Sequence, residues 1–189
     1  WSDWLDVEGE TRRIGVLHAL GNAVVVALYV GSWAARRRGK RGIGVGLGML
    51  AGGIATGTAY LGGHLVYSRG VGVDNTAFDR VPARWTKVLD DAEQLMEGTP
   101  LLTEVKNVPI FLVRNPDGVD ALHNRCTHRG GPLHKGVVKD GTVTCPWHES
   151  CFRLSDGAVL QGPATAPQPT YEARIVDGAV EVRRRADRP

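Results

Sequence analysis

Two short stretches each bring a cysteine and a histidine close together, and they constrain the fold more than any other feature of the chain. The first reads Cys126-x-His128 and the second reads Cys145-x-x-His148, with sixteen residues between them. A thiolate and an imidazole so close on one tight loop can bind the same inorganic centre. The chain must therefore fold so that the two loops meet, and together they would supply two Cys and two His ligands.

Two kinds of inorganic centre use that ligand set. A structural zinc ion binds all four ligands in one tetrahedron, whereas a Rieske [2Fe–2S] cluster has two Cys on one iron and two His on the other. Zinc modules usually separate the first two ligands by two to four residues. Here one residue separates Cys126 from His128, and each loop mixes the two ligand types. The spacing favours the iron–sulfur cluster and leaves zinc as an alternative.

The residues around the four candidate ligands extend this pattern. Most are glycines, prolines or small polar residues, namely Gly130, Gly131, Pro132, Leu133, Pro146 and Ser150. On these motifs the stretch over residues 85–182 resembles the Rieske ferredoxin-type family. The resemblance implies an antiparallel all-β domain whose two loops bind a [2Fe–2S] cluster through the two Cys and two His residues. It also implies that Ser150 donates to a bridging sulfide and that the proline-rich residues 161–169 pack beside the cluster.

Turn signals support the same fold. Four Asp-Gly dipeptides lie between short β-rich runs, at residues 117–118, 140–141, 156–157 and 177–178. Asp-Gly favours tight hairpin turns because those turns need a positive φ, which glycine tolerates. We therefore predict antiparallel hairpins over residues 83–189.

Ligand type sets the redox potential of such a cluster. Two neutral imidazoles leave the oxidised cluster less negative than four thiolates would, so Rieske centres lie higher, at roughly −150 to +300 mV. In high-potential members of the family a disulfide joins the two loops and a tyrosine donates to a ligand sulfur. Gly131, Trp147 and Phe152 occupy those positions here, and Glu149 stands where the family usually has glycine. The resemblance therefore implies a low-potential, ferredoxin-like centre, between about −150 and 0 mV.

One cysteine remains after the ligands are assigned. Cys151 is at neither disulfide position. We expect it to be a small, partly buried side chain beside the second loop, and we predict no disulfide.

Two long runs without charge occupy the first part of the chain. They cover about residues 14–35 and 43–68, and each is long enough to cross a bilayer as a helix. A domain of 82 residues could not bury both runs on every side as soluble core helices. We therefore predict a membrane region over residues 1–82, with a linker over residues 71–83, followed by the cluster domain over residues 83–189. Residues 15–22 and 60–73 also resemble a poorly characterised bacterial membrane-domain family found fused to Rieske domains.

The distribution of charge predicts an orientation. Five Lys and Arg residues lie within residues 36–41, between the two runs, and such a loop is expected in the cytoplasm. Both ends of the chain would then lie on the other side of the cell membrane, so the cluster domain of this multi-pass protein is expected to be extracytoplasmic. Residues 83–189 hold fourteen basic and fourteen acidic residues. That balance excludes nucleic acid as a partner.

The second run is rich in glycine. Gly44, Gly48 and Gly52 lie at every fourth residue, and Gly53 and Gly57 follow. Small residues at this spacing let helices approach closely in lipid. We expect this face to pack against the first helix or against another subunit, which would make an oligomer.

Four histidines lie outside the ligand set. His123 and His134 flank the first loop, and we expect them to be ordinary hydrogen-bonding residues. His18 and His64 lie inside the two runs, each about 6 Å from the same membrane surface at about 1.5 Å rise per residue. Polar rings within a membrane are often functional, so a haem or a quinol site could be built on the pair. The alternative, which we favour, is hydrogen bonding to headgroups or to neighbouring helices.

Together these features predict a membrane-anchored carrier of single electrons that uses a Rieske-type [2Fe–2S] cluster and meets a redox partner protein or a quinol. Two alternatives remain: an electron-delivery subunit of an oxygenase or reductase complex, and a zinc-stabilised interaction module. No 2-His-1-carboxylate iron site of the kind that oxygenases use is visible. The sequence therefore shows no site for converting a substrate.

Overall fold

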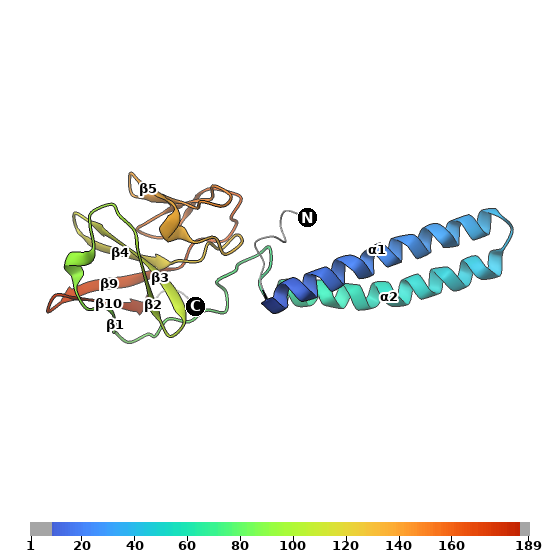
Figure 1. Ribbon diagram of the computed structural model, residues 1–189, viewed down its shortest axis with the longest axis horizontal. Helices are drawn as coiled ribbons and strands as arrows, with labels where there is room; N and C mark the ends of the chain where they lie inside the picture. The colour runs from blue at the N-terminus through green and yellow to red at the C-terminus, as the bar shows by residue number, and fades with distance from the viewer. Residues whose placement is uncertain (1–8, 186–189) are drawn as a thin grey trace. The chain divides into compact units, whose positions relative to one another are not determined.

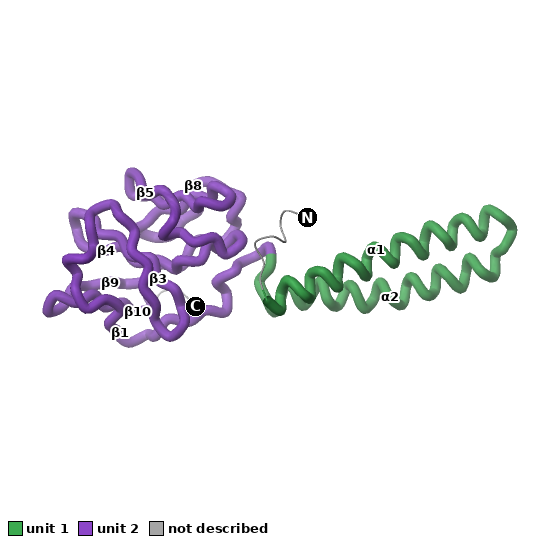
Figure 2. The backbone as a smooth tube through the Cα atoms, viewed as in Figure 1, with its two compact units in different colours: residues 1–71 green, residues 72–189 purple. Residues whose placement is uncertain are grey.

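The computed structural model describes residues 9–185. It divides into two compact units, Trp1–Val71 and Gly72–Pro189 (Figure 2). The first unit contains two antiparallel helices, α1 (Gly9–Arg37) and α2 (Arg41–Tyr67) (Figure 1). Both helices are long and apolar enough to cross a membrane, and only 11% and 17% of their most apolar windows are buried. A core helix of a soluble protein would be mostly buried. The two helices predicted from the uncharged runs are therefore confirmed.

Glycine permits the close approach of the two helices. The Ser32 hydroxyl donates a hydrogen bond of 2.6 Å to the carbonyl oxygen of Gly44. A Cβ atom at Gly44 would overlap the Arg36 side chain and lie 2.9 Å from the Ser32 carbonyl oxygen. Gly48 also faces Ser32 and Arg36, whereas Gly57 has open space around it. The first part of the glycine-rich face thus packs against α1.

The second unit, here called the β domain, consists of two antiparallel sheets. The first has six strands in the order β1-β10-β9-β4-β3-β2. Its strands are β1 (Thr86–Leu89), β2 (Leu101–Val105), β3 (Val108–Asn115), β4 (Gly118–His123), β9 (Thr170–Val176) and β10 (Ala179–Arg184). The second sheet has four strands in the order β5-β6-β7-β8. These are β5 (Val137–Lys139), β6 (Thr142–Thr144), β7 (Cys151–Arg153) and β8 (Val159–Gln161). The antiparallel all-β domain predicted from the Asp-Gly turns is confirmed.

The Asp-Gly pairs lie where the hairpins turn. Asp140 and Gly141, between β5 and β6, have φ angles of 48° and 71°. Asp177 and Gly178, between β9 and β10, have φ angles of 49° and 79°. Two consecutive positive φ angles are the signature of the tight hairpin turn that Asp-Gly favours. These two turns therefore follow directly from local sequence.

Strand β3 is buried on both faces. Because side chains alternate along a strand, Ile110 and Leu112 join one hydrophobic cluster, while Phe111 and Val113 join another. The second cluster also contains Val143 of the four-stranded sheet, together with Phe152, Cys126 and Cys145. The two sheets are therefore packed against each other in the same core that contains both candidate ligand cysteines.

The β domain begins before the residue at which the sequence pattern changes. Val81 is buried in the first hydrophobic cluster, and the Arg184 backbone N–H donates to the Pro82 carbonyl oxygen at 3.0 Å. Asn75 also donates its backbone N–H to Thr127, at 3.0 Å. Residues 75–82, expected to be part of a linker, therefore pack against the β domain.

Substituting Gly44 with Val should lower the stability of the helix pair by about 1–3 kcal/mol, because the added side chain overlaps α1 and cannot be accommodated without moving a helix. The measurement is reversible unfolding of the helix pair in mixed detergent. Gly46→Val is the matched control, because a Cβ atom at Gly46 meets nothing within 4 Å. Equal destabilisation by the two substitutions would contradict close packing at Gly44.

Candidate metal centre

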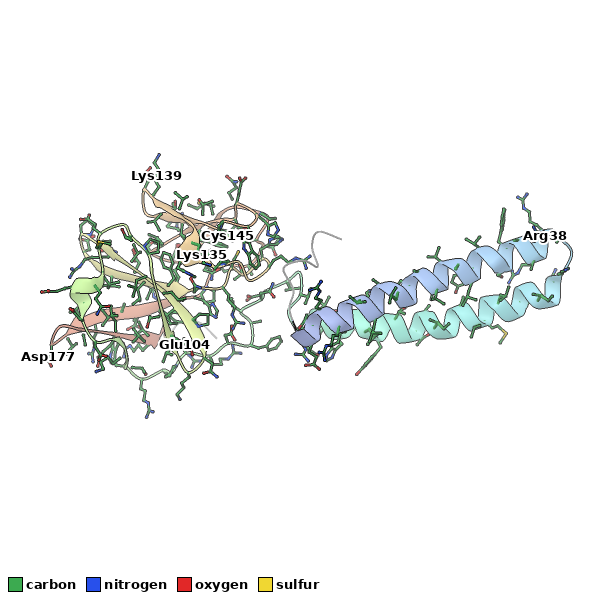
Figure 3. The ribbon with its side chains drawn as sticks, in the orientation of Figure 1. Arg38, Glu104, Lys135, Lys139, Cys145 and Asp177 are labelled. Carbon is green, nitrogen blue, oxygen red and sulfur yellow. The ribbon has the colours of Figure 1, made fainter. Side chains whose placement is uncertain are left out.

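The four candidate ligands lie on two neighbouring loops of the β domain. The first loop (residues 124–132) follows β4, and the second loop (residues 145–150) follows β6. Cys126 and Cys145 are 1% and 2% exposed, and their thiols are close enough to form a hydrogen bond. The rings of His128 and His148 are partly exposed, with their centroids 4.9 Å apart and their planes perpendicular. The fold thus brings all four residues together as a buried thiol pair and a partly exposed imidazole pair (Figure 3 labels Cys145).

The two loops are closed by the same pair of backbone hydrogen bonds. In the first, the Cys126 carbonyl accepts from Gly130 at 2.7 Å, and the Cys126 N–H donates to Gly131 at 2.8 Å. In the second, the Cys145 carbonyl accepts from Glu149 at 3.1 Å, and the Cys145 N–H donates to Ser150 at 2.9 Å. Each cysteine therefore bonds to the residues four and five positions later. The loops have the same geometry although their Cys–His spacings differ.

The shared turn has a conformation that favours glycine at the residue four positions after each cysteine. Gly130 has a φ of 80°, and Glu149, its counterpart in the second loop, has a φ of 60°. Glycine adopts this left-handed conformation without steric cost, whereas a residue with a Cβ atom is strained there. Glu149 therefore occupies a position that suits glycine.

The turns also direct backbone N–H groups at the sulfurs. His128 and Arg129 donate to Cys126, and Trp147 and His148 donate to Cys145. The pKa of Cys145 is lowered to about 6, because the Cys126 thiol donates a hydrogen bond to it and the two N–H groups add to this effect against the opposing effect of burial. The pKa of Cys126 is raised, because its proton is held by Cys145 and because burial disfavours its charge. A thiolate is the form that binds a metal.

Gly131 lies in contact with the second loop. A Cβ atom there would be 2.7 Å from the Cys145 sulfur and 3.1 Å from the Trp147 ring. In high-potential Rieske proteins a disulfide joins the positions that Gly131 and Trp147 occupy here. These two residues are neighbours, and the Trp147 indole packs on Gly131. All three cysteines of the chain lie in the described residues, and each is a free thiol.

Ser150 and Phe152 border the buried thiol pair. Ser150 is fully buried, and its Oγ accepts a 3.0 Å hydrogen bond from the backbone N–H of Ala164 in the proline-rich segment. That bond uses a lone pair of the hydroxyl, so its hydrogen is available to another acceptor. Phe152 is fully buried in the same hydrophobic cluster as both cysteines. Cys151 on β7 is half-buried.

Gln168 is a central residue that sequence reasoning did not single out. Its side chain is fully buried. Nε2 donates to the carbonyl oxygens of His123 and Arg125 at 2.6 and 2.7 Å, and Oε1 accepts from the Thr127 N–H at 3.1 Å. One amide thus fixes the backbone on both sides of Cys126. A glutamine among prolines gave no local signal of this role.

A second polar cluster lies beside the first loop. His123 is 1% exposed, its Nε2–H donates to Asp79 at 2.8 Å, and its Nδ1 accepts the Arg125 backbone N–H at 3.0 Å. The Arg125 side chain also donates to Asp79. Burial raises the pKa of Asp79, but hydrogen bonds and charge from His123 and Arg125 outweigh it, so this pKa lies below its usual value. His123 is a hydrogen-bonding residue as expected, although it lies in the interior.

The two membrane histidines differ in their surroundings. His18 Nδ1 donates to the Thr58 carbonyl oxygen at 2.8 Å, so its Nε2 accepts from the Asn22 side chain at 3.1 Å. Its ring also fills the space above Gly62 on α2. His64 is half-buried near the end of α2. The bonds of His18 support a role in joining the two helices.

The donor set fits a [2Fe–2S] cluster. Two buried sulfurs lie side by side and receive backbone N–H donors, and two imidazoles from the same two loops lie against each other. Cys and His in equal pairs are the ligands of a Rieske centre.

Comparisons with known proteins agree with this fit. Residues 84–172 match the family described as "Rieske [2Fe-2S] domain", and residues 2–75 match a family described as "Predicted membrane protein (DUF2231)". The chain is 37% identical over 90 residues to the anthranilate 1,2-dioxygenase ferredoxin subunit of Burkholderia cepacia, covering 48% of this chain and 83% of that protein.

Two solved structures are similar to the β domain. One is the ferredoxin of carbazole 1,9a-dioxygenase from Nocardioides aromaticivorans IC177, with 26% identity and a TM-score of 0.50, covering 53% of this chain and 98% of that chain. Another is a chain in the complex of reduced oxygenase and oxidized ferredoxin in carbazole 1,9a-dioxygenase. It has 26% identity and a TM-score of 0.50, covering 56% of this chain and 99% of that chain.

The fold and the site therefore define an iron–sulfur electron carrier of the ferredoxin type, with a [2Fe–2S] cluster as its cofactor. The chain belongs to the Rieske [2Fe–2S] family, and its cluster domain is joined to a membrane domain.

Substituting Glu149 with Gln should raise the midpoint potential of the cluster, because the carboxylate disfavours the more negative reduced state. For a charge about 10 Å away in water-rich surroundings, the rise is about 10–40 mV at low salt, and added salt should diminish it. A redox titration measures it. Glu149→Gly removes the same charge together with the left-handed strain, so it should give the same rise without loss of thermal stability. An unchanged potential in both variants would show that the carboxylate does not influence the cluster.

Proposed function

We propose that Cys126 and Cys145 bind one iron of the [2Fe–2S] cluster and that His128 and His148 bind the other. The observation that carries this proposal is the sorting of the four side chains into two pairs, with adjacent thiols in the core and adjacent rings nearer the surface. A Rieske cluster needs that sorting, because ligands of one kind share one iron.

The proposed function of the site is the transfer of single electrons, which the cluster supplies when bound. The buried side of the site keeps water from the thiolates and stabilises them with backbone N–H donors. The partly exposed imidazoles form the edge through which an electron would leave. Trp147, 41% exposed and edge-on to the His148 ring, adds an aromatic surface there. Aromatic side chains of this kind are frequent at protein interfaces, so we place the docking of a redox partner at this edge.

Substituting Cys126 with Ser or His148 with Ala should each prevent stable cluster assembly, because each removes a ligand of a different iron. The measurements are iron and acid-labile sulfide content and the EPR spectrum of the reduced protein. Cys151→Ser is the matched control, since it removes a half-buried thiol next to the second loop and should leave the spectrum unchanged. A native spectrum in Cys126→Ser would refute the ligand set. Zinc without sulfide in the unsubstituted protein would favour the interaction module instead.

We propose that the electron partner is a protein component of an oxygenase or reductase system, with a quinol as the alternative. The relatives support a protein partner, because one is named as a dioxygenase subunit and another is described in complex with an oxygenase. The absence of a disulfide, Phe152 in place of tyrosine and the carboxylate of Glu149 support a potential in the lower part of the Rieske range.

We propose that the helices span the cell membrane and that the cluster domain is extracytoplasmic. The basic residues 36–41, which cover the end of α1, the connecting turn and the start of α2, support this orientation. From the sequence we assign residues 1–82 to the membrane region, whose spans are α1 and α2, and residues 83–189 to the cluster domain, against which residues 75–82 pack. Gly53 and Gly57, each with open space around it, could admit a helix of a second copy, which is our proposal for an oligomer.

The orientation predicts the behaviour of reporters fused after the β domain. Alkaline phosphatase should be active there, because it matures only outside the cytoplasm, and green fluorescent protein exported in the unfolded state should be dark. Replacing the five basic residues of 36–41 with Gln should weaken the bias. A fluorescent fusion together with an inactive phosphatase would place the cluster domain in the cytoplasm.

A further inference from the structure

The chain segment that follows the membrane helices contacts the first loop directly. The Asn75 backbone N–H donates to the Thr127 carbonyl oxygen at 3.0 Å, and its side-chain Nδ2 donates to the His128 carbonyl oxygen at 2.8 Å. One half-buried residue therefore holds two consecutive carbonyl groups. The second of these belongs to a proposed iron ligand.

Asn75 is itself fixed by a local turn. The Asp74 carboxylate accepts hydrogen bonds from the Thr76 N–H at 2.7 Å and from the Thr76 hydroxyl at 2.6 Å. This is the arrangement by which an Asp stabilises a turn around its own backbone. Thr76 is 3% exposed, so the turn is anchored in the domain.

The segment has a second anchor at Asp79, which accepts hydrogen bonds from His123 and Arg125. Residues 74–79, here called the strap, therefore contact the first loop both before and after Cys126. The part of the chain that matches the Rieske family begins at residue 84. The strap thus lies before the Rieske match, with Asp74 and Asn75 at the end of the match to the membrane-protein family, and the function derived above does not account for its contacts with the first loop.

We propose that Asn75 is a positioning residue for the imidazole side of the cluster, a role that rests on the ligand assignment made above. Its side chain fixes the peptide plane that follows His128 and so fixes the direction in which the ring leaves the backbone. The perpendicular packing of the His128 and His148 rings, 4.9 Å apart, depends on that direction. Hydrogen bonds beyond the ligands orient ligands and tune the metal they bind.

The test is Asn75→Ala in the full chain, purified in detergent with its cluster. Its iron and sulfide content should match the unsubstituted protein, but the g-values of the reduced cluster should shift, the lines should broaden and the midpoint potential should move. Loss of the side-chain hydrogen bond lets the His128 ring vary in orientation from molecule to molecule, and these readouts report that variation.

The matched control is Asn115→Ala, at the last residue of β3 before the turn to β4. Asn115 donates to Asp120 at 2.7 Å and accepts from the Asp117 N–H at 2.9 Å through its side chain. The control substitution therefore removes two side-chain hydrogen bonds, whereas Asn75→Ala removes one. It lies at the opposite end of the hairpin from His123. We expect a lower melting temperature with unchanged g-values and potential.

Each outcome decides the proposal. Unchanged g-values and potential in Asn75→Ala overturn it, even if the melting temperature falls as in the control. If Asn75→Ala holds no cluster, Asn75→Ser, which restores a hydroxyl donor, is measured as well. The proposal is supported if Asn75→Ser recovers the cluster with shifted g-values. It is also supported if the β domain is folded but lacks a cluster in both variants. An unfolded β domain in both variants overturns it. Failure of the ligand assignment is distinguishable, because it appears as a retained cluster in Cys126→Ser.

Discussion

The proximity of two buried thiols is the constraint on which the rest of the site depends. Cys126 and Cys145 lie side by side with almost no exposure. As thiolates they would lose hydration and repel each other, and burial of such charge is costly without compensating donors. The compensation comes from the backbone, since each sulfur receives N–H groups from the residues two and three positions later. Only a tightly curled turn aims those N–H groups at the sulfur, so both loops adopt the same turn.

The two turns are held at the correct separation by the core of the β domain. Phe111 of β3, Val143 of β6 and Phe152 of β7 share one hydrophobic cluster with the two cysteines. Packing between sheets therefore fixes the ends of β4 and β6, from which the loops extend. A site supported on packed strands holds its geometry better than one built only on loops. The buried amide of Gln168 adds polar bonds where this apolar packing ends.

Local spacing in the sequence predicted the elements that depend on local interactions. The Cys and His positions, the hairpins at Asp140 and Asp177 and the two apolar helices are all encoded within a few residues to a few turns. The contacts of Gln168 with His123 and Thr127 join residues more than forty positions apart. No periodic pattern in the sequence predicts such a pair, because only the tertiary fold brings the two residues together.

Two further features show the same limit. Residues 71–83 contain Gly, Asp, Asn and Pro, a composition typical of linkers, yet part of this segment forms a turn that binds the first loop. From the sequence, Gly131 belongs to the glycine and proline pattern of the first loop and stands where high-potential members have a cysteine. The structure shows in addition that a side chain there would collide with the Cys145 sulfur. In both cases the sequence shows the residue type, but only the structure shows which residue it contacts.

The equivalence of Gly130 and Glu149 connects the shape of the turn with the electrostatics of the site. The residue four positions after each cysteine has a positive φ in both loops, and this turns the chain so that the carbonyl of the next residue accepts the cysteine N–H. A non-glycine residue in this conformation costs on the order of 1 kcal/mol. The second loop bears that cost and gains a carboxylate beside a centre whose reduced state is more negative than its oxidised state. Glu149 thus combines backbone strain with an unfavourable charge. The first loop avoids both, because it has Gly130 at the equivalent position. Residues that break a local rule concentrate at functional sites, and here the exception would lower the potential at which the carrier accepts its electron.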